Sequence, residues 1–436
     1  MNLAGKKIGI VGLGSTGIAC LEYLHKQNQI IFFDDNLQHA HKVSLLYGQN
    51  LLAPLEDPRW QEIQYLLVSP GVPLHFPQKH QILSITKQAQ IISDIELFCA
   101  MHHKAKIAAI TGTNGKSTTV SLLASIMLEH DYLLGGNIGT PCLKLAKAGG
   151  YILELSSFQL DLLQNFKPNI AAITNITPDH LERYPSMESY ISSKLSIARN
   201  MNKDDYLIIN IDDAILKTKI SSFAHTNLIT ISAKQQADIY WQDGYIIDAT
   251  EKYAFNPTIA LAGEHNLQNT LIAYSAAKTA GIAPETILAK IQAFPGLIHR
   301  MQYIKTYKNI AFYNDSKATN AQAASCALKA LDNIFWLAGG IEKFGGIKTI
   351  SNLLTKVRKA YFFGQDGANL AKQASPFTEV VLSSTMQEAF KMALEDGQNF
   401  GQKCNILLSP ACASLDQFKN FEDRGQQFIQ LIKNLT

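Results

Sequence analysis

Short apolar runs alternate with stretches of helical periodicity along the whole chain. The runs occur at 7–11, 30–33, 65–68 and 91–93, then at 107–110, 151–155, 170–175, 206–210 and 259–262, and finally at 309–313, 334–337, 361–363, 380–382 and 405–408. Helices are expected at 95–101 and 120–128, from about His265, and after Pro284. Strands that alternate with helices in this way are typical of parallel sheets covered by helices on both faces. We therefore predict an α/β fold.

The grouping of these runs predicts the domain organisation. A chain of 436 residues corresponds to two or three domains at about 150 residues per domain. The turn Phe294-Pro295-Gly296 separates the second group of runs from the third. We predict a Rossmann-like domain at 1–93, a central α/β domain at 94–297 and a second Rossmann-like domain at 298–436.

Composition and charge narrow the class of protein. Hydrophobic residues make up 47% of the chain and charged residues 17%, so complete cores can be buried. The 39 Lys and Arg nearly balance the 36 Asp and Glu, with no long run of one sign, which argues against a nucleic-acid-binding protein. The N-terminus makes a poor signal peptide. The chain has no uncharged apolar stretch of about 18 residues, so we expect no membrane-spanning helix. The six scattered cysteines form no Cys-x-x-Cys pair, which is typical of reduced thiols, so we expect a cytoplasmic protein without membrane contact.

The segment 111–119, Thr-Gly-Thr-Asn-Gly-Lys-Ser-Thr-Thr, has the pattern of a phosphate-binding loop between a strand and a helix. Glycines let backbone amides turn toward an anion, and the helix N-terminus adds positive potential. Lys116 supplies a point charge, and Ser117 offers an oxygen to Mg²⁺. Only Thr113 and Asn114 separate the first glycine from the Gly-Lys pair, where the usual Walker pattern has four residues. The loop predicts that the central domain is of the P-loop type and binds a nucleoside triphosphate, while a glycine turn without a ligand is the alternative.

A second glycine motif, Gly12-Leu13-Gly14-Ser15-Thr16-Gly17, follows the first strand, and Asp34-Asp35 end the second. This pattern is a dinucleotide-binding fingerprint, which makes an NAD-dependent oxidoreductase one alternative. However, the fingerprint indicates only that a phosphate approaches a helix N-terminus, and any nucleoside diphosphate could supply that phosphate. A tight turn without a ligand is a further alternative. In addition, an NAD-dependent oxidoreductase would not need the separate phosphate loop at 111–119.

Two side chains near later strand ends are candidates for metal binding. Glu154 is a charge amid apolar neighbours, which is costly unless the carboxylate is paired or bound to a metal. His180 follows the next strand, and strand ends of a parallel sheet converge at one edge. We interpret both as neighbours of a Mg²⁺ ion, while a surface or capping histidine is the alternative for His180.

Six segments, taken in order, resemble one protein family. They are 111–119, 154–160, 175–184, 263–269 (Gly-Glu-His-Asn-Leu-Gln-Asn), 314–320 (Asn-Asp-Ser-Lys-Ala-Thr-Asn) and 408–425, which includes Ser-Pro-Ala-Cys-Ala-Ser-Leu-Asp-Gln-Phe. With the first glycine motif they make the chain similar to the Mur ligase family of ATP-dependent amide-forming enzymes, across all three domains. The resemblance implies that ATP phosphorylates a substrate carboxylate, that an amino acid's amine attacks the acyl phosphate, and that phosphate leaves. It implies UDP-N-acetylmuramoyl-L-alanine and D-glutamate as substrates, in peptidoglycan precursor synthesis.

The resemblance also implies roles for individual residues. For ATP they are Gly112, Thr113, Asn114, Gly115, Lys116, Ser117 and Thr118, with Asn266, Asn269 and Arg300 on the adenine side and Asp315 at the ribose. For Mg²⁺ they are Ser117, Glu154, His180 and a carbamylated Lys194. For the uridine-linked substrate they are Gly14, Ser15, Thr16, Asp34, Asp35 and Gly71, with Asn137 and Gln159 nearer the muramoyl-alanine end. For D-glutamate they are Lys317, Thr319, Lys343, Ser414 and the backbone near Phe421. The implied catalytic residues are Lys116, His180, Lys194 and Lys317.

Lys194 stands where the family carries a carbamylated lysine. An ammonium group cannot bind Mg²⁺, whereas addition of CO₂ to the neutral amine gives a carboxylate-like group that can. The resemblance therefore implies carbamylation, while the sequence alone predicts a solvated helix residue.

Two positions depart from the family pattern. Asn36 stands where many relatives have an arginine that contacts the nucleotide, and Glu182 stands where aspartate is more usual. A sibling ATP-dependent ligase for another amino acid, and a non-catalytic nucleotide-gated protein, are further alternatives to the D-glutamate ligase. We expect a monomer whose C-terminal domain closes over the other two about a hinge near 294–296.

Overall fold

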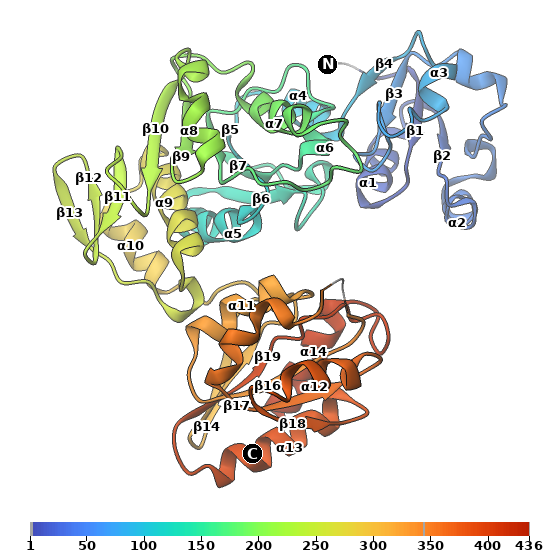
Figure 1. Ribbon diagram of the computed structural model, residues 1–436. Helices are drawn as coiled ribbons and strands as arrows, with labels where there is room; N and C mark the ends of the chain where they lie inside the picture. Colours follow the sequence, from blue (N-terminus) through green and yellow to red (C-terminus); the bar gives the residue numbers. More distant parts are fainter. Residues whose placement is uncertain (1–2, 343–344, 436) are drawn as a thin grey trace. The chain divides into compact units, whose positions relative to one another are not determined.

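The computed structural model describes residues 3–342 and 345–435, which form two compact units (Figure 1). The first unit runs to Asn256 and resumes over His265–Ile291. The second takes Pro257–Glu264 and continues from Gln292. The first unit holds two parallel-stranded sheets and the second holds one. The domain boundaries at 93/94 and 297/298 stay a prediction.

The N-terminal sheet has the strand order β2-β1-β3-β4, and all its strands are parallel. Ile8 and Ile10 of β1 belong to one hydrophobic cluster and Val11 to another, so apolar layers cover both faces of this strand. The strands and helices of this part are β1 (Lys7–Val11), α1 (Ser15–Leu24), β2 (Gln29–Phe33), α2 (Leu37–Tyr47), η1 (Gln49–Leu51), η2 (Pro58–Gln61), β3 (Tyr65–Val68), α3 (Ile82–Ile85) and β4 (Gln90–Ile92).

The central sheet has nine strands in the order β13-β12-β11-β10-β9-β8-β5-β7-β6. Its strands are parallel from β6 to β11, and β12 and β13 add an antiparallel hairpin. They are β5 (Lys106–Thr111), β6 (Tyr132–Gly136), β7 (Gly150–Glu154), β8 (Ile170–Ile173), β9 (Tyr206–Asn210), β10 (Asn227–Ser232), β11 (Ile239–Gln242), β12 (Tyr245–Asp248) and β13 (Glu251–Ala254).

Helices flank this sheet as the alternation of elements predicts. One hydrophobic cluster joins α4, α7 and α8 to the sheet, whereas α5 contacts β5, β6 and β7 through residues outside that cluster. The helices are α4 (Asp94–Met101), α5 (Lys116–Met127), η3 (Leu128–His130), η4 (Cys142–Lys144), α6 (Ser157–Leu160), α7 (Met187–Leu195), η5 (Ser196–Ala198), α8 (Ala214–Lys219), η6 (Ile220–Phe223), α9 (Glu264–Thr279) and α10 (Pro284–Gln292).

The C-terminal sheet has the order β14-β15-β19-β16-β17-β18, in which only β14 is antiparallel to its neighbour. One hydrophobic cluster joins α11, η8 and α12 to this sheet, and another joins α13 and α14, so helices cover both faces. The elements are β14 (Gln302–Tyr307), β15 (Ile310–Asn314), α11 (Ala321–Ala330), β16 (Ile334–Gly339), η8 (Lys348–Lys356), β17 (Val357–Phe363), α12 (Gly367–Ala374), β18 (Glu379–Leu382), α13 (Met386–Asn399), β19 (Cys404–Leu408) and α14 (Phe421–Lys433).

One predicted strand is wrong. The run 259–262 forms a 3₁₀ helix, η7 (Ile259–Leu261), in which the Leu261 amide donates to the Thr258 carbonyl at 3.0 Å. Pro257, two residues before Ile259, has no amide hydrogen for a strand ladder, which favours a turn. The apolar runs did not reveal β6, the strands β10–β13, or β14.

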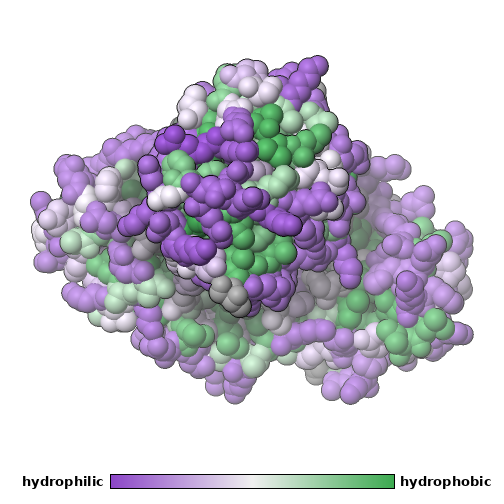
Figure 2. Space-filling view, turned by 90° about the horizontal axis from the view of Figure 1, so that it is seen from below, coloured by the Kyte–Doolittle hydropathy of each residue, from purple (hydrophilic) through white to green (hydrophobic). Residues whose placement is uncertain are grey.

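One face of the molecule is mostly hydrophilic. Hydrophilic residues cover most of the face in view in Figure 2, with hydrophobic residues in smaller patches. Within the part of the chain that the structure describes, no helix combines the length and apolar character needed to cross a bilayer. All six cysteines carry free thiols.

Candidate active site

The phosphate loop lies between β5 and α5, as predicted. Gly112 has φ of 144°, and a Cβ there would lie 1.9 Å from the Thr174 hydroxyl oxygen. Gly115 has φ of 85°, and a Cβ there would lie 2.3 Å from the Asn269 side-chain oxygen. Because a side chain at either position would collide with its neighbour, only glycine fits this path of the backbone.

Hydrogen bonds hold the loop against the end of β8. The Thr113 amide donates to the Asn175 carbonyl at 2.8 Å, and the Asn114 amide donates to Asn175 Oδ1 at 2.9 Å. The Thr174 hydroxyl donates to the Asn114 carbonyl at 2.6 Å. The first turn of α5 has no side-chain cap and no acidic residue, so its amides can receive an anion.

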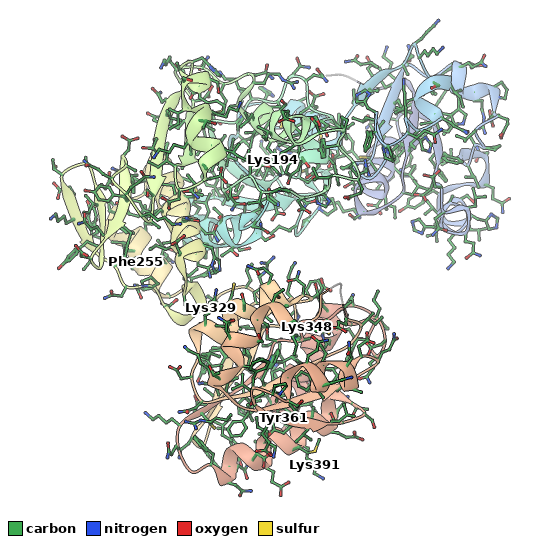
Figure 3. All side chains as sticks on the ribbon, in the orientation of Figure 1. Lys194, Phe255, Lys329, Lys348, Tyr361 and Lys391 are labelled. Carbon is green, nitrogen blue, oxygen red and sulfur yellow. The ribbon has the colours of Figure 1, made fainter. Side chains whose placement is uncertain are left out.

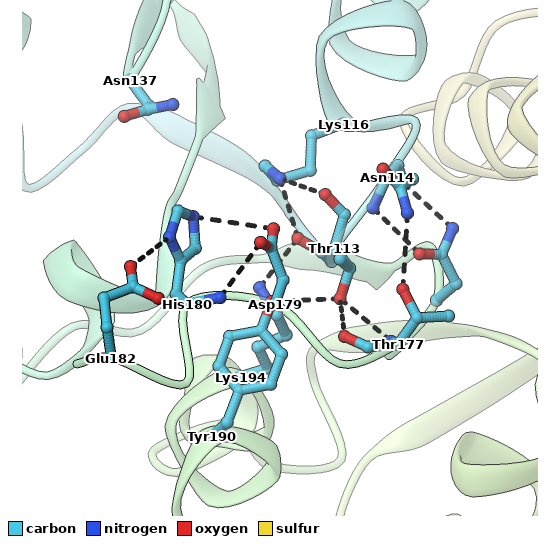
Figure 4. A network of polar contacts seen from close by, with 12 residues as sticks. Thr113, Asn114, Lys116, Asn137, Thr177, Asp179, His180, Glu182, Tyr190 and Lys194 are labelled. Carbon is cyan, nitrogen blue, oxygen red and sulfur yellow. Dashed lines mark hydrogen bonds and ion pairs between the residues drawn. The ribbon is translucent and has the colours of Figure 1, made fainter. Parts of the chain in front are cut away.

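Lys116 folds back over this loop (Figure 4). Its Nζ donates to the Gly112 and Thr113 carbonyls at 2.8 Å each. A flexible ammonium at the mouth of a phosphate loop can transfer these hydrogen bonds to phosphate oxygens when a nucleotide binds.

Lys194 shares one of these carbonyls from the opposite side. It lies on α7, is 2% exposed, and its Nζ donates to the Gly112 carbonyl at 2.8 Å (Figures 3 and 4). Its Nζ also lies 4.6 Å from the centre of the Tyr190 ring. Burial, with the nearby Lys116 ammonium, lowers the pKa of Lys194 to about 7. The interpretation of Lys194 as a solvated helix residue is therefore wrong, because the fold buries its amine and keeps much of it neutral near pH 7.

Glu154 closes β7 and is 1% exposed. Its Oε1 accepts a hydrogen bond from the Asn137 side-chain amide at 2.9 Å, whereas its Oε2 is buried and has no hydrogen-bond partner among the described residues. A buried carboxylate oxygen without a partner is costly, and a hard cation such as Mg²⁺ would satisfy it. The side chain therefore fits the metal that the sequence implies.

The predicted metal residues come from four different elements. Ser117 begins α5, Glu154 ends β7, His180 lies in the loop 174–186 after β8, and Lys194 lies on α7. Among residues 3–342 and 345–435, no three His, Cys, Asp or Glu side chains gather as a metal site. Only two of the predicted ligands are of these types, so phosphate and water oxygens would complete the coordination, as Mg²⁺ sites commonly require.

His180 occupies an unusual backbone conformation, with φ of 53°. Its side chain is 46% exposed, with Nδ1 3.4 Å from Glu182 Oε1 and Nε2 3.6 Å from Asp179 Oδ2. Its ring lies 5.0 Å from that of Phe158. Figure 4 shows this histidine with Asp179 and Glu182 in the same close-up as the phosphate loop.

All eight residues predicted for the uridine-linked substrate line one pocket of about 410 Å³ in the first unit. They are Gly14, Ser15, Thr16, Asp34, Asp35, Gly71, Asn137 and Gln159. The glycine motif supplies one wall, at the start of α1, and the ends of β3 and β6 supply others. Residues far apart in the chain thus converge on one cavity.

The two acidic residues of the pocket have different partners. Asp34 accepts hydrogen bonds from the amides of Leu13, at 2.6 Å, and Asn36, at 2.8 Å, so it orders the glycine loop. Asp35 is 74% exposed on its side chain and lies 3.1 Å from His80 Nε2. Asn36, which departs from the family pattern, caps α2 through its side chain.

Six further residues line the pocket but were not predicted as site residues: Val11, Gly12, Ser69, Pro70, Val72 and Gly136. Ser69 donates through its hydroxyl to the Gly12 carbonyl at 2.7 Å and so links the glycine loop to the end of β3. Ser69, Pro70 and Val72 lie in the loop after β3, and Gly136 ends β6. This placement was the available signal, since ligands bind at the carboxyl ends of parallel strands.

Close packing at Gly17 gives a stability prediction. A Cβ at Gly17 would lie 1.9 Å from the Gly12 carbonyl oxygen, whereas one at Gly14 would meet nothing within 4 Å. We expect Gly17→Ala to lower the free energy of unfolding by about 3 kcal/mol, because backbone must move. Gly14→Ala, the matched control, is expected to change it by less than about 0.5 kcal/mol. Thermal or denaturant unfolding checks both, and equal values for the two variants would contradict the packing argument.

The start of α9 lies beside the phosphate loop. Asn269 Oδ1 accepts a hydrogen bond from the Thr119 hydroxyl at 3.3 Å, and its Nδ2 donates to Asn266 Oδ1 at 3.2 Å. The structure thus brings both predicted adenine-side asparagines to the loop that precedes α5.

The second unit contains the remaining predicted residues near strand ends. Asp315 follows β15, accepts hydrogen bonds from the Ser409 hydroxyl at 2.7 Å and the Met301 amide at 3.2 Å, and is buried. Burial raises the pKa of Asp315 to about 7. Arg300 directly precedes Met301 in the same segment. The carboxylate of Asp315 therefore ties the segment before β14 to the ends of β15 and β19.

The predicted D-glutamate residues gather around two loops of this unit. Lys317 Nζ lies 4.7 Å from the centre of the Phe421 ring, and the Ser316 hydroxyl donates to the Phe421 carbonyl at 2.8 Å. Thr319 follows in the same loop, and Ser414, 3% exposed, lies in the loop after β19. Lys343 lies outside the residues that the structure describes.

Sequence reasoning missed the role of Arg424 in these loops. Its guanidinium is fully buried and donates to the carbonyls of Ser316, Gly339 and Cys412 at 2.9, 3.2 and 3.1 Å. It therefore ties together the loops that follow β15, β16 and β19. A cation at this position has no special sequence signal, because its burial comes from packing.

The chain matches three family models along its length. They are the Mur ligase MurD-like N-terminal domain at 6–93, the Mur ligase middle domain at 110–277, and the Mur ligase glutamate ligase domain at 299–412. It is 44% identical to the UDP-N-acetylmuramoylalanine–D-glutamate ligase of Rickettsia prowazekii, with 98% of each chain covered. It is 37% identical to the protein of the same name in Phenylobacterium zucineum, with 99% of this chain and 97% of that one covered.

Solved structures agree in fold. The UDP-N-acetylmuramate–alanine ligase of Thermotoga maritima matches with a TM-score of 0.62 and 18% identity, over 99% of this chain and 100% of that one. A pseudomurein peptide ligase from Methanothermus fervidus matches with a TM-score of 0.57 and 17% identity, over 99% and 100%. The predicted α/β fold class is thus confirmed, and so is the resemblance seen in the sequence: this chain belongs to the Mur ligase family.

Proposed function

We propose that this protein is the ATP-dependent ligase that joins D-glutamate to UDP-N-acetylmuramoyl-L-alanine in peptidoglycan precursor synthesis. The observation that carries the proposal is the phosphate loop with Lys116, set beside a buried glutamate oxygen that lacks a partner, in a chain whose full-length relatives bear the name of this ligase. ADP and phosphate are the other products.

The chain's own residues support each part of the reaction. Amides of the loop and the Lys116 ammonium hold the β- and γ-phosphates while a carboxylate oxygen of the UDP-substrate attacks the γ-phosphorus and ADP leaves. The amine of D-glutamate then attacks the acyl carbon and loses a proton, and inorganic phosphate departs from the tetrahedral intermediate. Glu154 and Ser117 would hold Mg²⁺, which neutralises charge on the phosphates when it is bound.

Carbamylation of Lys194 belongs to this proposal. CO₂ adds only to a neutral amine, and burial favours the neutral amine of Lys194 at pH values above its lowered pKa of about 7. The same buried position would place the resulting carbamate near the phosphate loop, since Nζ lies 2.8 Å from the Gly112 carbonyl. A carbamate there, with His180, would supply oxygen and nitrogen atoms to a second Mg²⁺.

The substrate ends are assigned to separate parts of the chain. The pocket of about 410 Å³ takes the uridine diphosphate end, with Asn137 and Gln159 toward the muramoyl-alanine end. Asn266, Asn269, Arg300 and Asp315 serve the nucleoside of ATP. D-Glutamate, with two carboxylates, meets Lys317, Thr319, Lys343, Ser414 and the backbone at Phe421. The protein acts as a monomer of three domains, 1–93, 94–297 and 298–436, and the third domain closes over the other two about a hinge near 294–296.

Phosphate release from ATP tests the proposal directly. With UDP-N-acetylmuramoyl-L-alanine and Mg²⁺ present, we expect D-glutamate to support release at least about 100-fold faster than L-glutamate, L-lysine or glycine, because an ordered site discriminates through its polar contacts. Reactions without amino acid serve as the control.

Other outcomes would identify the alternatives. Faster release with another amino acid would identify a sibling ligase. Enhanced NADH fluorescence on mixing with the protein, without any phosphate release, would favour an oxidoreductase.

A further inference from the structure

One side chain of the loop 174–186, between β8 and α7, makes a hydrogen bond to the wall of the N-terminal pocket. Arg183 Nη1 donates a hydrogen bond to the Gly71 carbonyl at 2.8 Å. Gly71 is part of the pocket wall that follows β3. Among the hydrogen bonds of the described residues, this is the only one that joins the loop to the wall segment 69–72.

Arg183 also contacts the turn that carries His180. Its guanidinium carbon lies 4.6 Å from the centre of the Phe158 ring, and the His180 ring lies 5.0 Å from the same ring. The Arg183 amide donates to the His180 carbonyl at 2.8 Å. Phe158 thus contacts both the guanidinium and the imidazole, and the backbone supplies a second link.

Arg183 also lines a second, smaller pocket of about 220 Å³, whose lining includes the apolar Val72 and Leu74 and the acidic Asp161. Arg183 itself is half-buried, and its hydrogen bond to Gly71 is exposed. The contact between its guanidinium and the Phe158 ring is therefore a modest cation–π interaction at a partly solvated site. On the other side, a Cβ at Gly71 would meet nothing within 4 Å, so the wall has room to adjust to a ligand.

We propose that Arg183 is a positioning residue that couples occupancy of the N-terminal pocket to the placement of His180. The inference rests on the proposed function, in which that pocket takes the uridine diphosphate end and His180 lies beside the metal. A ligand that orders segment 69–72 fixes the carbonyl to which Arg183 donates, and the guanidinium then holds Phe158 and the His180 turn. These four residues form a continuous chain of contacts that can carry such coupling.

Binding of UDP alone, followed by NMR of protein with isotope-labelled histidine, tests the coupling without catalysis. His80 reports on pocket occupancy because its Nε2 lies 3.1 Å from Asp35, which lines the pocket. We expect UDP to shift the resonances of both His80 and His180, the latter identified with His180→Gln. In Arg183→Met, which keeps an unbranched apolar chain but removes the guanidinium and its donors, the His80 shift should persist and the His180 shift should fall at least about fivefold.

Two further variants separate coupling from folding. Arg199 Nη1 also donates to a backbone carbonyl, that of Leu163 at 3.3 Å, so Arg199→Met is a matched control that should behave as the unaltered protein. Arg183→Lys keeps the cation and should restore part of the His180 shift. In the full reaction, Arg183→Met should lower kcat about 10-fold and leave the KM for ATP within about twofold.

Each remaining outcome has a definite meaning. A His180 shift of full size in Arg183→Met would overturn the coupling and leave the pocket assignment standing. UDP that shifts neither histidine in the unaltered protein would overturn the pocket assignment, and the coupling with it. Equal losses in Arg183→Met, Arg183→Lys and Arg199→Met, with lowered thermal midpoints, would show a purely structural role.

Discussion

Replacement of Lys116 by alanine is expected to lower kcat about 10³-fold with little change in stability. The ammonium now donates to two loop carbonyls at 2.8 Å, which places it at the mouth of the phosphate loop. In the proposed reaction it stabilises charge that develops on the transferring phosphoryl group, and loss of one such donor typically costs about 10²–10³-fold. Phosphate release with saturating substrates measures the effect.

An exposed lysine on the strand that precedes the phosphate loop provides the control for this variant. Lys106 is exposed at the start of β5, at the opposite end of the strand from the loop. Lys106→Ala is expected to keep kcat within about twofold, since exposed substitutions away from a site change little. A Lys116→Ala protein that folds normally and keeps its rate would refute the assignment of this loop to ATP.

Replacement of Lys194 by alanine is expected to lower kcat at least about 100-fold, and a short carboxylic acid such as acetate is expected to restore part of it. Removal of the side chain takes away the proposed carbamate, a metal-binding group, and leaves space in which a small carboxylate can bind. Lys194→Met fills that space with an apolar chain of similar length, so it should lose activity without rescue by acetate.

Carbon NMR with isotope-labelled bicarbonate tests the modification apart from activity. Because burial lowers the pKa of Lys194 to about 7, the neutral amine, and with it the carbamate signal, should increase from about pH 6 to about pH 8. The signal should be absent from Lys194→Ala. Full activity of Lys194→Ala, or no labelled carbamate in the unaltered protein at the higher pH, would exclude carbamylation.

The lowered pKa of Lys194 also has a consequence for stability. Between the folded value of about 7 and the ordinary lysine value of 10.5, the unfolded chain binds more protons than the folded chain. The contribution of this group to the free energy of unfolding therefore rises with pH across that interval.

Most of the strands could be predicted because they are continuous apolar runs buried on both faces, such as 7–11 and 334–337. Strands with one half-exposed face were missed. In β10, four of the six residues are partly exposed. The hairpin of β11 and β12 turns at Asp243-Gly244, a dipeptide that favours hairpin turns, but the residues on either side of it were not apolar enough to be recognised as strands. The strand predicted at 259–262 was wrong because hydrophobicity alone does not account for the missing amide of Pro257.

The sequence by itself determined the chemistry that is local along the chain. A phosphate loop needs its glycines, lysine and serine within a few residues of one another, so the segment 111–119 predicts a phosphate ligand without any knowledge of the fold. The same holds for the glycine motif at 12–17 and the family segments, whose residue types reflect turns and contacts formed close by.

Only the tertiary structure decided which distant residues act together and in what electrostatic state. It buried the amine of Lys194 against the Gly112 carbonyl, left an oxygen of Glu154 without a partner, and placed Arg183 between the Gly71 wall and His180. Burial and long-range contacts depend on segments that lie tens of residues apart in the chain, so no pattern around Lys194 or Arg183 could reveal them. Desolvation and proximity are properties of the folded molecule, and they turn an ordinary lysine and arginine into parts of a site.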